Sequence, residues 1–406
     1  MPNSLILSNS FDGHRQVYVY IFAHVLNELG FKIFVAGNLE EKILDSTYLN
    51  MLKKDKSITF IHIGNYTKDH SNILKNEFIE LQDTCDADLT IFAEADGHIP
   101  LFNSQIFNKG KLRGRNIGIF FRPYYFYEKL NFLNKLRYIK RLPSVWREDD
   151  YLFHEYLLKQ FRLLDGAMYL DEYFVSRHSN SQFLPDVFQS YADILIKDEN
   201  KDQRIWIEKL RCFKEKNQGK FIFLYFGTAA KRRGYDSLIK MAVEYDACFV
   251  HCGLYYEKQN FDLELSELKT FLQKSGRLFE TNEYISDPLC IEYFFKSVDR
   301  LILPYRNFYG SSGVMLQALN FGIPVLAPEK GIMGYRIKKY KLGITYDDKN
   351  ENNLKSNFDY FRNLDPKTFS NNIKSYMNLQ STGELIKALK QAFSIPGHSF
   401  IQPVQG

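Results

Sequence analysis

The chain has 406 residues, more than the roughly 250 to 300 at which a single hydrophobic core stops growing, so we expect two domains. Hydrophobic residues make up 45% of it and charged residues 25%, which is ordinary for a packed globular protein and excludes a disordered one. The formal net charge of +5 is too small to indicate a nucleic-acid-binding protein, so we expect no nucleic-acid partner.

Cysteine usage indicates a reducing compartment. The five cysteines are scattered and form no C-x-x-C pair, so the sequence predicts neither a disulfide framework nor a structural zinc site. Segment 1–15 lacks the basic region and long apolar run of a signal peptide, and the apolar stretch 17–23 is far below the ~20 residues of a membrane-spanning helix. We therefore expect a cytoplasmic protein.

Short apolar runs alternate with helix-length segments in the first half of the chain. In the first helix Tyr18, Phe22, Val25 and Leu29 recur at helical spacing, and Gly30 stands where a C-terminal cap is expected. Regular strand and helix alternation predicts a parallel α/β sheet. The expected strands are 4–9, 32–37, 58–64, 89–96, 116–121 and 166–171.

A second series of the same kind begins near residue 220. Its expected strands are 220–227, 247–253, 277–281, 299–305, 323–329 and 343–347. Four helices are expected between them: one begins near residue 235, one ends near 274, one runs through 295 and one begins near 312. The sequence thus predicts two doubly wound domains, 1–190 and 191–375, a hinge within 186–204, and a C-terminal helix and tail, 376–406, that packs back on the first domain. Such domains bind ligands at the carboxyl ends of their strands, so we expect the active site in the cleft between them.

The first strand of the second domain leads into a basic loop. Residues 226–235 read FGTAAKRRGY, so three cations follow a glycine at the start of a helix. Backbone N–H groups and the positive end of the helix add to the side chains there, which favours an anion. A solvated basic turn is the other interpretation.

A later loop, within 303–325, carries the sequence Gly-Ser-Ser-Gly immediately before a helix. Serine hydroxyls and the free N–H groups of a helix start can hold a diphosphate or a sugar hydroxyl. The alternative is that Ser311 or Ser312 serves only as an N-cap.

Taken in order, these motifs resemble the donor domain of GT-B glycosyltransferases, and most closely family 4, the retaining nucleotide-sugar transferases. The match runs from the glycine and basic loop at 227–234, through VHCG at 250–253, YI at 284–285 and DRLILP at 299–304, to GSSGV and GIPV within 310–325. It covers 220–346 well, and the first half only in architecture. The expected fold class is therefore α/β, GT-B, with two facing Rossmann-like domains.

The resemblance implies roles for individual residues. Arg233 matches the cation that grips the donor diphosphate, and Lys231 is the candidate substitute for a second cation, because Thr228 stands where many members have arginine. Of the family's two glutamates, the first falls on Tyr309 and the second on Gln317, which can hydrogen-bond a nucleotide ribose. The implied donor-binding set is Gly227, Lys231, Arg233, Tyr284, Ile285, Ser311, Ser312, Gly313 and Gln317.

The tripeptide Asp-Gly-His occurs twice in the first domain, each time just beyond an expected strand. We expect Asp12, Gly13, His14 and Arg122 to contact the acceptor, and His98 or Asp96 to lie near the reacting centre. Turn and capping roles for the aspartates are the alternative. The spacing matches no metal motif, so we expect no metal and no cofactor beyond the nucleotide sugar.

Aromatic residues, 16% of the chain, concentrate in segment 120–146, where Lys and Arg also outnumber the acids. Such a segment can lie on the cytoplasmic face of an anionic inner membrane or receive a lipid-linked acceptor. Packing of an aromatic helix on the sheet, with its cations solvated, is an equally good interpretation.

These observations predict a metal-independent, retaining glycosyltransferase. It would move a sugar from a nucleotide diphosphate sugar to a glycan or lipid-linked acceptor in the synthesis of cell-surface polysaccharide or glycolipid. Because Tyr309 replaces a glutamate, a catalytically silent GT-B scaffold or binding protein is one alternative. A nucleotide-sugar epimerase, which needs no acceptor, is the other.

Overall fold

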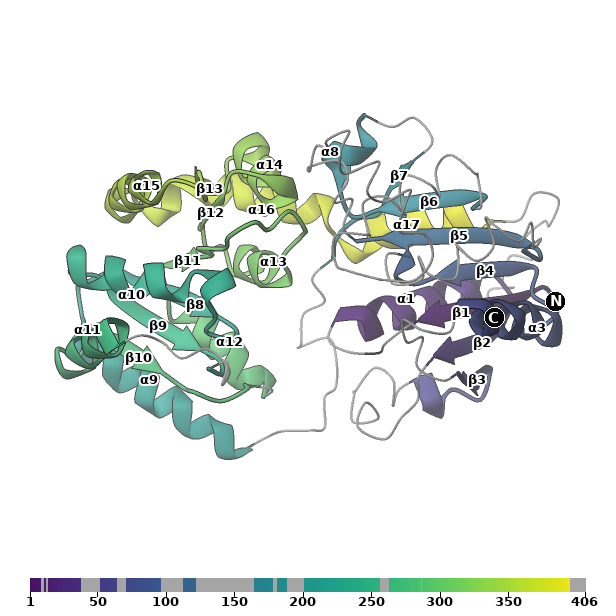
Figure 1. Cartoon of the computed structure of the whole chain (residues 1–406), viewed down its shortest axis with the longest axis horizontal. Helices are drawn as coiled ribbons and strands as arrows, with labels where there is room; N and C mark the ends of the chain where they lie inside the picture. The colour runs from purple at the N-terminus through teal and green to yellow at the C-terminus, as the bar shows by residue number, and fades with distance from the viewer. Residues whose placement is uncertain are drawn as a thin grey trace, which may run out of the picture. The chain divides into compact units, whose positions relative to one another are not determined.

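The structure is a computed structural model that describes residues 1–8, 11, 14–37, 52–63, 71–95, 112–121, 164–177, 181–187, 201–255, 263–285 and 287–394. The chain divides into two compact units (Figure 1). Unit 1 comprises Met1–Asp186 and Thr382–Gly406, and unit 2 comprises Val187–Ser381. Each unit contains one parallel sheet with helices around it, which confirms the predicted α/β class.

The sheet of unit 1 has seven strands in the order β3-β2-β1-β4-β5-β6-β7, all parallel. Its inner strand β1 is buried on both faces, with Leu5, Ile6 and Leu7 fully covered, as is typical of a parallel sheet flanked by helices. The strands are β1 (Asn3–Ser8), β2 (Lys32–Gly37), β3 (Ile58–His62), β4 (Leu89–Phe92), β5 (Arg115–Phe120), β6 (Gly166–Tyr169) and β7 (Gln182–Phe183).

The described helices of unit 1 are α1 (His14–Glu28), α3 (Ser71–Thr84), α8 (Glu172–Val175) and the C-terminal α17 (Thr382–Phe393). Figure 1 shows α17 among the elements of unit 1, although it follows unit 2 in the chain. It packs on α1, where the rings of Phe22 and Phe393 lie 5.9 Å apart and Lys390 pairs with Glu28 at 2.7 Å. Helix α17 therefore contributes to the core of the first unit.

The sheet of unit 2 has six parallel strands in the order β10-β9-β8-β11-β12-β13. These strands are β8 (Ile222–Phe226), β9 (Cys248–Cys252), β10 (Leu278–Glu280), β11 (Arg300–Ile302), β12 (Val325–Pro328) and β13 (Gly343–Tyr346). Its helices are α9 (Ile205–Lys216), α10 (Tyr235–Glu244), α11 (Leu263–Lys274), α12 (Pro288–Lys296), α13 (Gly313–Asn320), α14 (Gly331–Tyr340), α15 (Glu351–Asn363) and α16 (Ser370–Leu379).

Buried aromatic rings fill much of the core of unit 2. Phe223 on β8 stacks on Phe249 with ring centroids 5.2 Å apart, and Phe358 of α15 lies 4.8 Å from Phe223. Phe294 and Phe295 of α12 are also fully buried. The aromatic excess of the sequence is therefore partly a property of this core, and not only of segment 120–146.

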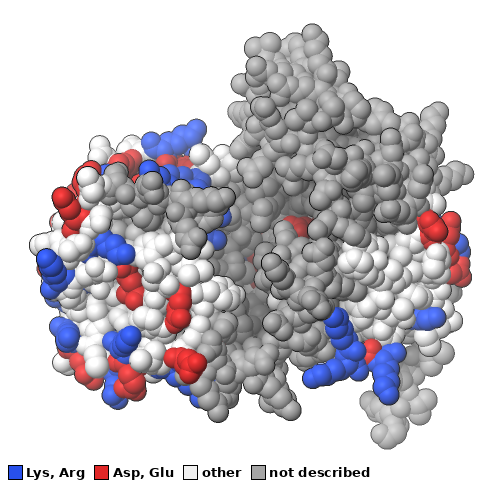
Figure 2. All heavy atoms as spheres, turned by 60° about the horizontal axis from the view of Figure 1, so that its bottom comes forward, with Lys and Arg blue, Asp and Glu red and all other residues white. Residues whose placement is uncertain are grey.

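The surface of unit 2 is electrically mixed. Figure 2 shows Lys, Arg, Asp and Glu interspersed over the described atoms of this unit, which fits the small net charge of +5. Among the described residues, no helix combines the length and the apolarity that crossing a bilayer requires.

Candidate functional site

The strand order of unit 2 creates a switch point between β8 and β11. From β8 the chain runs outward in one direction to β9 and β10, and from β11 in the other to β12 and β13. Loops that leave neighbouring strands in opposite directions open a crevice at the carboxyl ends of those strands, where open α/β sheets bind ligands. The basic loop follows β8 and the Gly-Ser-Ser-Gly loop follows β11, so both predicted motifs border this crevice.

The basic loop forms a single 3₁₀ turn, Lys231–Arg233, that ends at Gly234 with a φ of +69°. A Cβ at Gly234 would lie 1.8 Å from the carbonyl oxygen of Pro304, so only glycine lets the two loops approach this closely. Arg306 ties them together further, because its Nη1 donates to the Lys231 carbonyl at 2.7 Å and its Nη2 contacts Asp236 at 2.8 Å. The loop after β8 is thus fixed against the loop after β11.

The guanidinium of Arg233 lies between the loop after β8 and the loop after β11. It lies against Gly227, where an added Cβ would be 2.3 Å from Nη1, and over the ring of Tyr305 at 5.9 Å from the centroid. The side chain is half-buried, and the described residues provide it with no carboxylate partner. Lys231 and Arg232 are exposed. A half-buried guanidinium without a carboxylate is suited to an anionic ligand.

Helix α13 begins beside Tyr305. Ser312 is its N-cap and accepts a hydrogen bond from the Met315 N–H at 3.3 Å, so the capping interpretation holds for this serine. Tyr305 also hydrogen-bonds the Ser312 side chain, which links the helix start to the ring beneath Arg233. Gly313 is exposed, and a Cβ built on it meets no atom of the described residues within 4 Å. Open space therefore lies in front of the helix start, which carries a partial positive charge.

Two further side chains of this region, Arg336 and Gln317, are buried. Ser311 accepts a hydrogen bond at 2.8 Å from Nη1 of Arg336, a fully buried residue of α14. Gln317, one turn along α13 from Gly313, is 5% exposed, and its Nε2 has no hydrogen-bond partner among the described residues. A buried amide donor without a partner is costly unless a ligand or water supplies one, so Gln317 has capacity for a ligand atom.

Sequence reasoning missed Arg336. Helix α14 was not among the expected elements, because Gly331 and Gly334 favour a loop in sequence terms. In the structure a Cβ at Gly334 would lie 2.0 Å from the Glu329 carbonyl oxygen, so this glycine permits a close approach of backbone to helix. The sequence offers no distinct signal for Arg336, which stands two residues before a pair of lysines in GIMGYRIKKY, 331–340.

The remaining predicted donor residues lie on the loop after β10. Tyr284 is 73% exposed, and its carbonyl accepts a hydrogen bond from Gln203 at 2.8 Å. Ile285 is 4% exposed and packs in the hydrophobic core of unit 2. The side chain of Ile285 therefore has a packing role, and of this pair only Tyr284 presents its side chain to solvent.

The acceptor and catalytic predictions fall mostly outside the described residues. Those outside are Asp12, Gly13, Asp96, His98 and Arg122, together with 122–146 of the aromatic segment. His14 begins α1, but its side chain is likewise not described.

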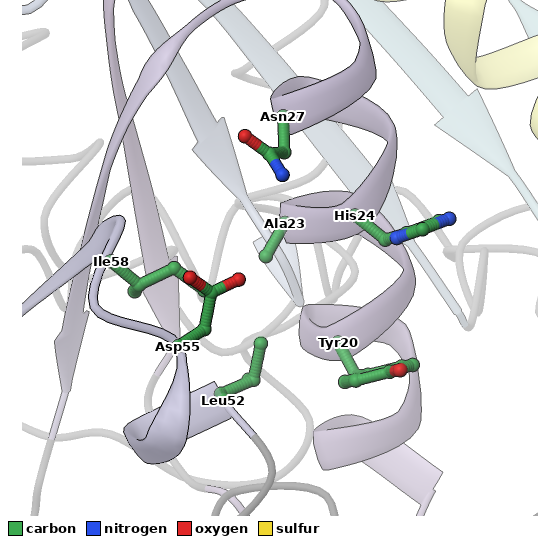
Figure 3. A pocket seen from close by; sticks show the side chains of 7 residues that line it. All are labelled: Tyr20, Ala23, His24, Asn27, Leu52, Asp55 and Ile58. Carbon is green, nitrogen blue, oxygen red and sulfur yellow. The ribbon is translucent and has the colours of Figure 1, made fainter.

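Unit 1 contains a separate small pocket of about 130 Å³ (Figure 3). Asn27 and Ala23 point from α1 towards the segment that carries Asp55, and Ile58 opens β3 beside it. This segment precedes β3, so the pocket lies toward the amino end of that strand, whereas parallel sheets bind ligands at the carboxyl ends. We therefore do not assign it to the donor or the acceptor.

Comparison with known proteins rests on structure alone, since no protein-family model matches the chain and no curated protein is similar to it in sequence. Anabaena Alr3699/HepE, solved in complex with UDP, is 14% identical and superposes over 96% of this chain and 98% of its own with a TM-score of 0.63. Sucrose-phosphate synthase from Thermosynechococcus elongatus is 12% identical over 96% and 97% of the two chains, with a TM-score of 0.62. WaaG, a glycosyltransferase involved in lipopolysaccharide biosynthesis, is 12% identical over 96% and 98%, with a TM-score of 0.52. This chain has the GT-B fold.

Proposed function

We propose that this protein is a glycosyltransferase whose donor is a nucleoside diphosphate sugar. The observation that carries the proposal is the half-buried guanidinium of Arg233, which has no carboxylate partner among the described residues and lies at the switch point of the second sheet. The exposed start of α13 at Gly313 borders the same crevice. A diphosphate would be held there by one cation and by the N–H groups of a helix start.

The chemistry would depend on stabilising the leaving group. As the bond between the anomeric carbon and the diphosphate oxygen breaks, negative charge grows on the diphosphate, and Arg233 and the start of α13 are positioned to neutralise it. Other transferases use a divalent ion for this purpose, and the proposed reaction needs none. The acceptor oxygen forms the new bond to the anomeric carbon and gives up its proton, for which Asp96 and His98 remain the candidates.

Two buried side chains support recognition of the nucleoside diphosphate. The Nε2 of Gln317, which has no hydrogen-bond partner in the described part of the chain, would donate to an oxygen of the ribose, one helical turn from Gly313. Arg336 orients the hydroxyl of Ser311 beside the helix start. We assign both to donor binding, the first by contact and the second through Ser311.

The resemblance supports a proposal for the acceptor and for the stereochemistry. WaaG acts in lipopolysaccharide biosynthesis, and this supports a glycan or lipid-linked acceptor in the synthesis of a cell-surface polysaccharide. We further propose retention at the anomeric carbon and a cytoplasmic site of action, with segment 120–146 touching the membrane surface.

Binding of UDP by calorimetry, with Arg233→Ala and Arg232→Ala as a matched pair, tests the proposed donor site. Loss of a charge-assisted contact to the diphosphate should weaken binding by about 10- to 100-fold in Arg233→Ala. The neighbouring Arg232 is exposed, so its removal should change affinity by less than about fivefold. Equal affinities of wild type and Arg233→Ala for each nucleoside diphosphate that binds would contradict the assignment.

A catalytically silent binding protein is the second candidate, because Tyr309 stands where the resembling enzymes have a glutamate. Tight binding of a nucleotide sugar without release of nucleoside diphosphate, with or without added acceptor, would favour it. Steady release of UDP from UDP-glucose would favour the transferase.

A further inference from the structure

A buried polar cluster lies at the carboxyl ends of β9 and β10, centred on Glu280. Its Oε1 accepts hydrogen bonds from the hydroxyls of Tyr235 and Tyr255, and Nδ1 of His251 lies 3.4 Å away. The second oxygen, Oε2, accepts from Gln273 at 2.8 Å and pairs with Lys269 at 3.0 Å. The side chains of His251 and Glu280 are 0% and 7% exposed, so two ionisable groups are buried together.

The cluster reaches the basic loop at its beginning. Gly227 is the first residue after β8, and its carbonyl accepts a hydrogen bond from Nε2 of His251 at 3.1 Å. Because a carbonyl oxygen only accepts, Nε2 must carry the hydrogen. Ionised Glu280 likewise only accepts, so its contact with Nδ1 is a hydrogen bond when that nitrogen also carries a hydrogen; through this contact Glu280 orients the imidazole and restrains Gly227.

The cluster also reaches the end of the loop. Tyr235, the first residue of α10, donates directly to Glu280, and Tyr255 pairs with Ala229 in an isolated parallel bridge. One carboxylate therefore restrains the loop at its first residue, in its middle and at the helix that follows it.

These restraints set the position of Arg233. The guanidinium of Arg233 lies against the backbone of Gly227, and a Cβ on that residue would clash with it. Gly253, on the opposite side, also requires the bare backbone, because a Cβ there would lie 2.3 Å from the Gly227 carbonyl oxygen. A shift of Gly227 would thus displace the guanidinium that rests on it.

Stability alone does not explain why the chain keeps such a cluster. Removing an ionised carboxylate from water is unfavourable, and well-packed apolar residues of similar volume often give equal or greater stability. A buried network in which hydrogen bonds fix several groups does supply a defined geometry.

We propose that Glu280 is a positioning residue for the donor diphosphate, acting through His251 and Tyr235 to hold the Gly227–Arg233 loop in its binding conformation before the ligand arrives. This inference rests on the proposed function. Its physical basis is preorganisation: a loop that is already ordered loses less conformational entropy on binding.

The test compares Glu280→Gln with Asn217→Ala in the full chain. The first change keeps the volume and removes the charge. Asn217 is a matched control, since it is a buried polar residue with several hydrogen bonds, but it caps α9 at the amino ends of the strands. For each variant we would measure the dissociation constant of UDP, the melting temperature, and hydrogen exchange of the backbone amides of residues 227–234 without ligand.

Glu280→Gln should weaken UDP binding at least about tenfold and speed amide exchange in residues 227–234. Asn217→Ala should lower the melting temperature while leaving UDP affinity within about twofold. In turnover, the KM for the donor should rise in Glu280→Gln with kcat nearly unchanged. If Glu280→Gln does not fold, Tyr235→Phe removes only the hydroxyl that Glu280 holds and should show the same pattern in smaller measure.

Wild-type affinity for UDP in Glu280→Gln, or a loss no larger than that of Asn217→Ala, would overturn the inference and leave the proposed function standing. A wild-type protein that binds none of UDP, GDP and ADP would overturn the proposed function, and this inference with it.

Discussion

A carboxylate at position 313 should raise the stability of the protein and weaken nucleotide binding at the same time. Gly313 is the first residue of α13, its φ is not among the positive ones, and a Cβ built on it meets no atom of the described residues within 4 Å. Gly313→Asp is therefore sterically tolerated. The same open space is where the diphosphate is proposed to lie.

The two effects have opposite signs and calculable sizes. Replacing a helical glycine stabilises by roughly 0.5 to 1 kcal/mol, and a carboxylate at a helix N-terminus adds roughly 0.3 to 1 kcal/mol, so the free energy of unfolding should rise by about 1 kcal/mol. A carboxylate about 5 Å from one diphosphate charge, at an effective dielectric constant of about 20, is repelled by about 3 kcal/mol, or roughly a hundredfold in affinity.

Urea denaturation and calorimetric titration with UDP measure the two quantities on the same samples. Gly313→Asn is the control, because it has the size of aspartate without the charge. It should gain less stability than Gly313→Asp and lose much less affinity. If Gly313→Asp binds UDP as tightly as the wild type, the start of α13 is not the diphosphate site; if it is clearly destabilised, the space in front of the helix is not open.

Three other changes have expected outcomes that depend on burial and packing. Burial raises the pKa of Glu280, but hydrogen bonds from His251 and the nearby tyrosines lower it further than burial raises it, to about 2 from an ordinary 4.5. The ionised Glu280 therefore contributes about 3 kcal/mol to the free energy of unfolding above pH 4.5, and this contribution is lost as the pH falls towards 2. In urea titrations at pH 7 and pH 3, Glu280→Gln should lose less stability between the two pH values than the wild type does. Gly234→Ala should destabilise by about 3 kcal/mol, because it combines a φ of +69° with a clash against Pro304, and an unchanged melting temperature would contradict the geometry of that loop. Leu389→Ala in α17 should cost about 3 kcal/mol in the unfolding of unit 1 and leave the calorimetric transition of unit 2 in place, whereas a shift of both transitions would speak against α17 belonging to unit 1 alone.

The sheet of unit 2 and six of the seven strands of unit 1 could be predicted from the sequence, because a buried parallel strand is a short apolar run between helical segments; the two-residue strand β7 (Gln182–Phe183) was not expected. The expected strand 220–227 is β8 (Ile222–Phe226), and the expected strand 247–253 is β9 (Cys248–Cys252). Helix α14 was missed, because Gly331 and Gly334 reduce the helix propensity of this segment. The structure explains Gly334 by the close approach of the Glu329 backbone, which the sequence does not show. The expected hinge, 186–204, extends into segment 201–216, and that segment contains helix α9.

The candidate site could be predicted only as far as local motifs reach. Arg233 and Gly313 stand in recognisable loops, so sequence order indicated both. The contacts between distant segments could not be foreseen: Arg336 reaches Ser311 from another helix, and Glu280 restrains Gly227 through a residue of a third strand. Such contacts depend on strand order and on side-chain direction, which a single sequence does not specify.

A crystal structure of the protein grown with UDP would locate the diphosphate itself. The proposed function predicts that its oxygens lie within hydrogen-bond distance of the Arg233 guanidinium and of the backbone N–H groups at the start of α13, at the carboxyl ends of β8 and β11. UDP bound elsewhere in the chain, or this crevice empty at saturating UDP, would contradict the proposal that these two loops form a nucleotide-sugar site.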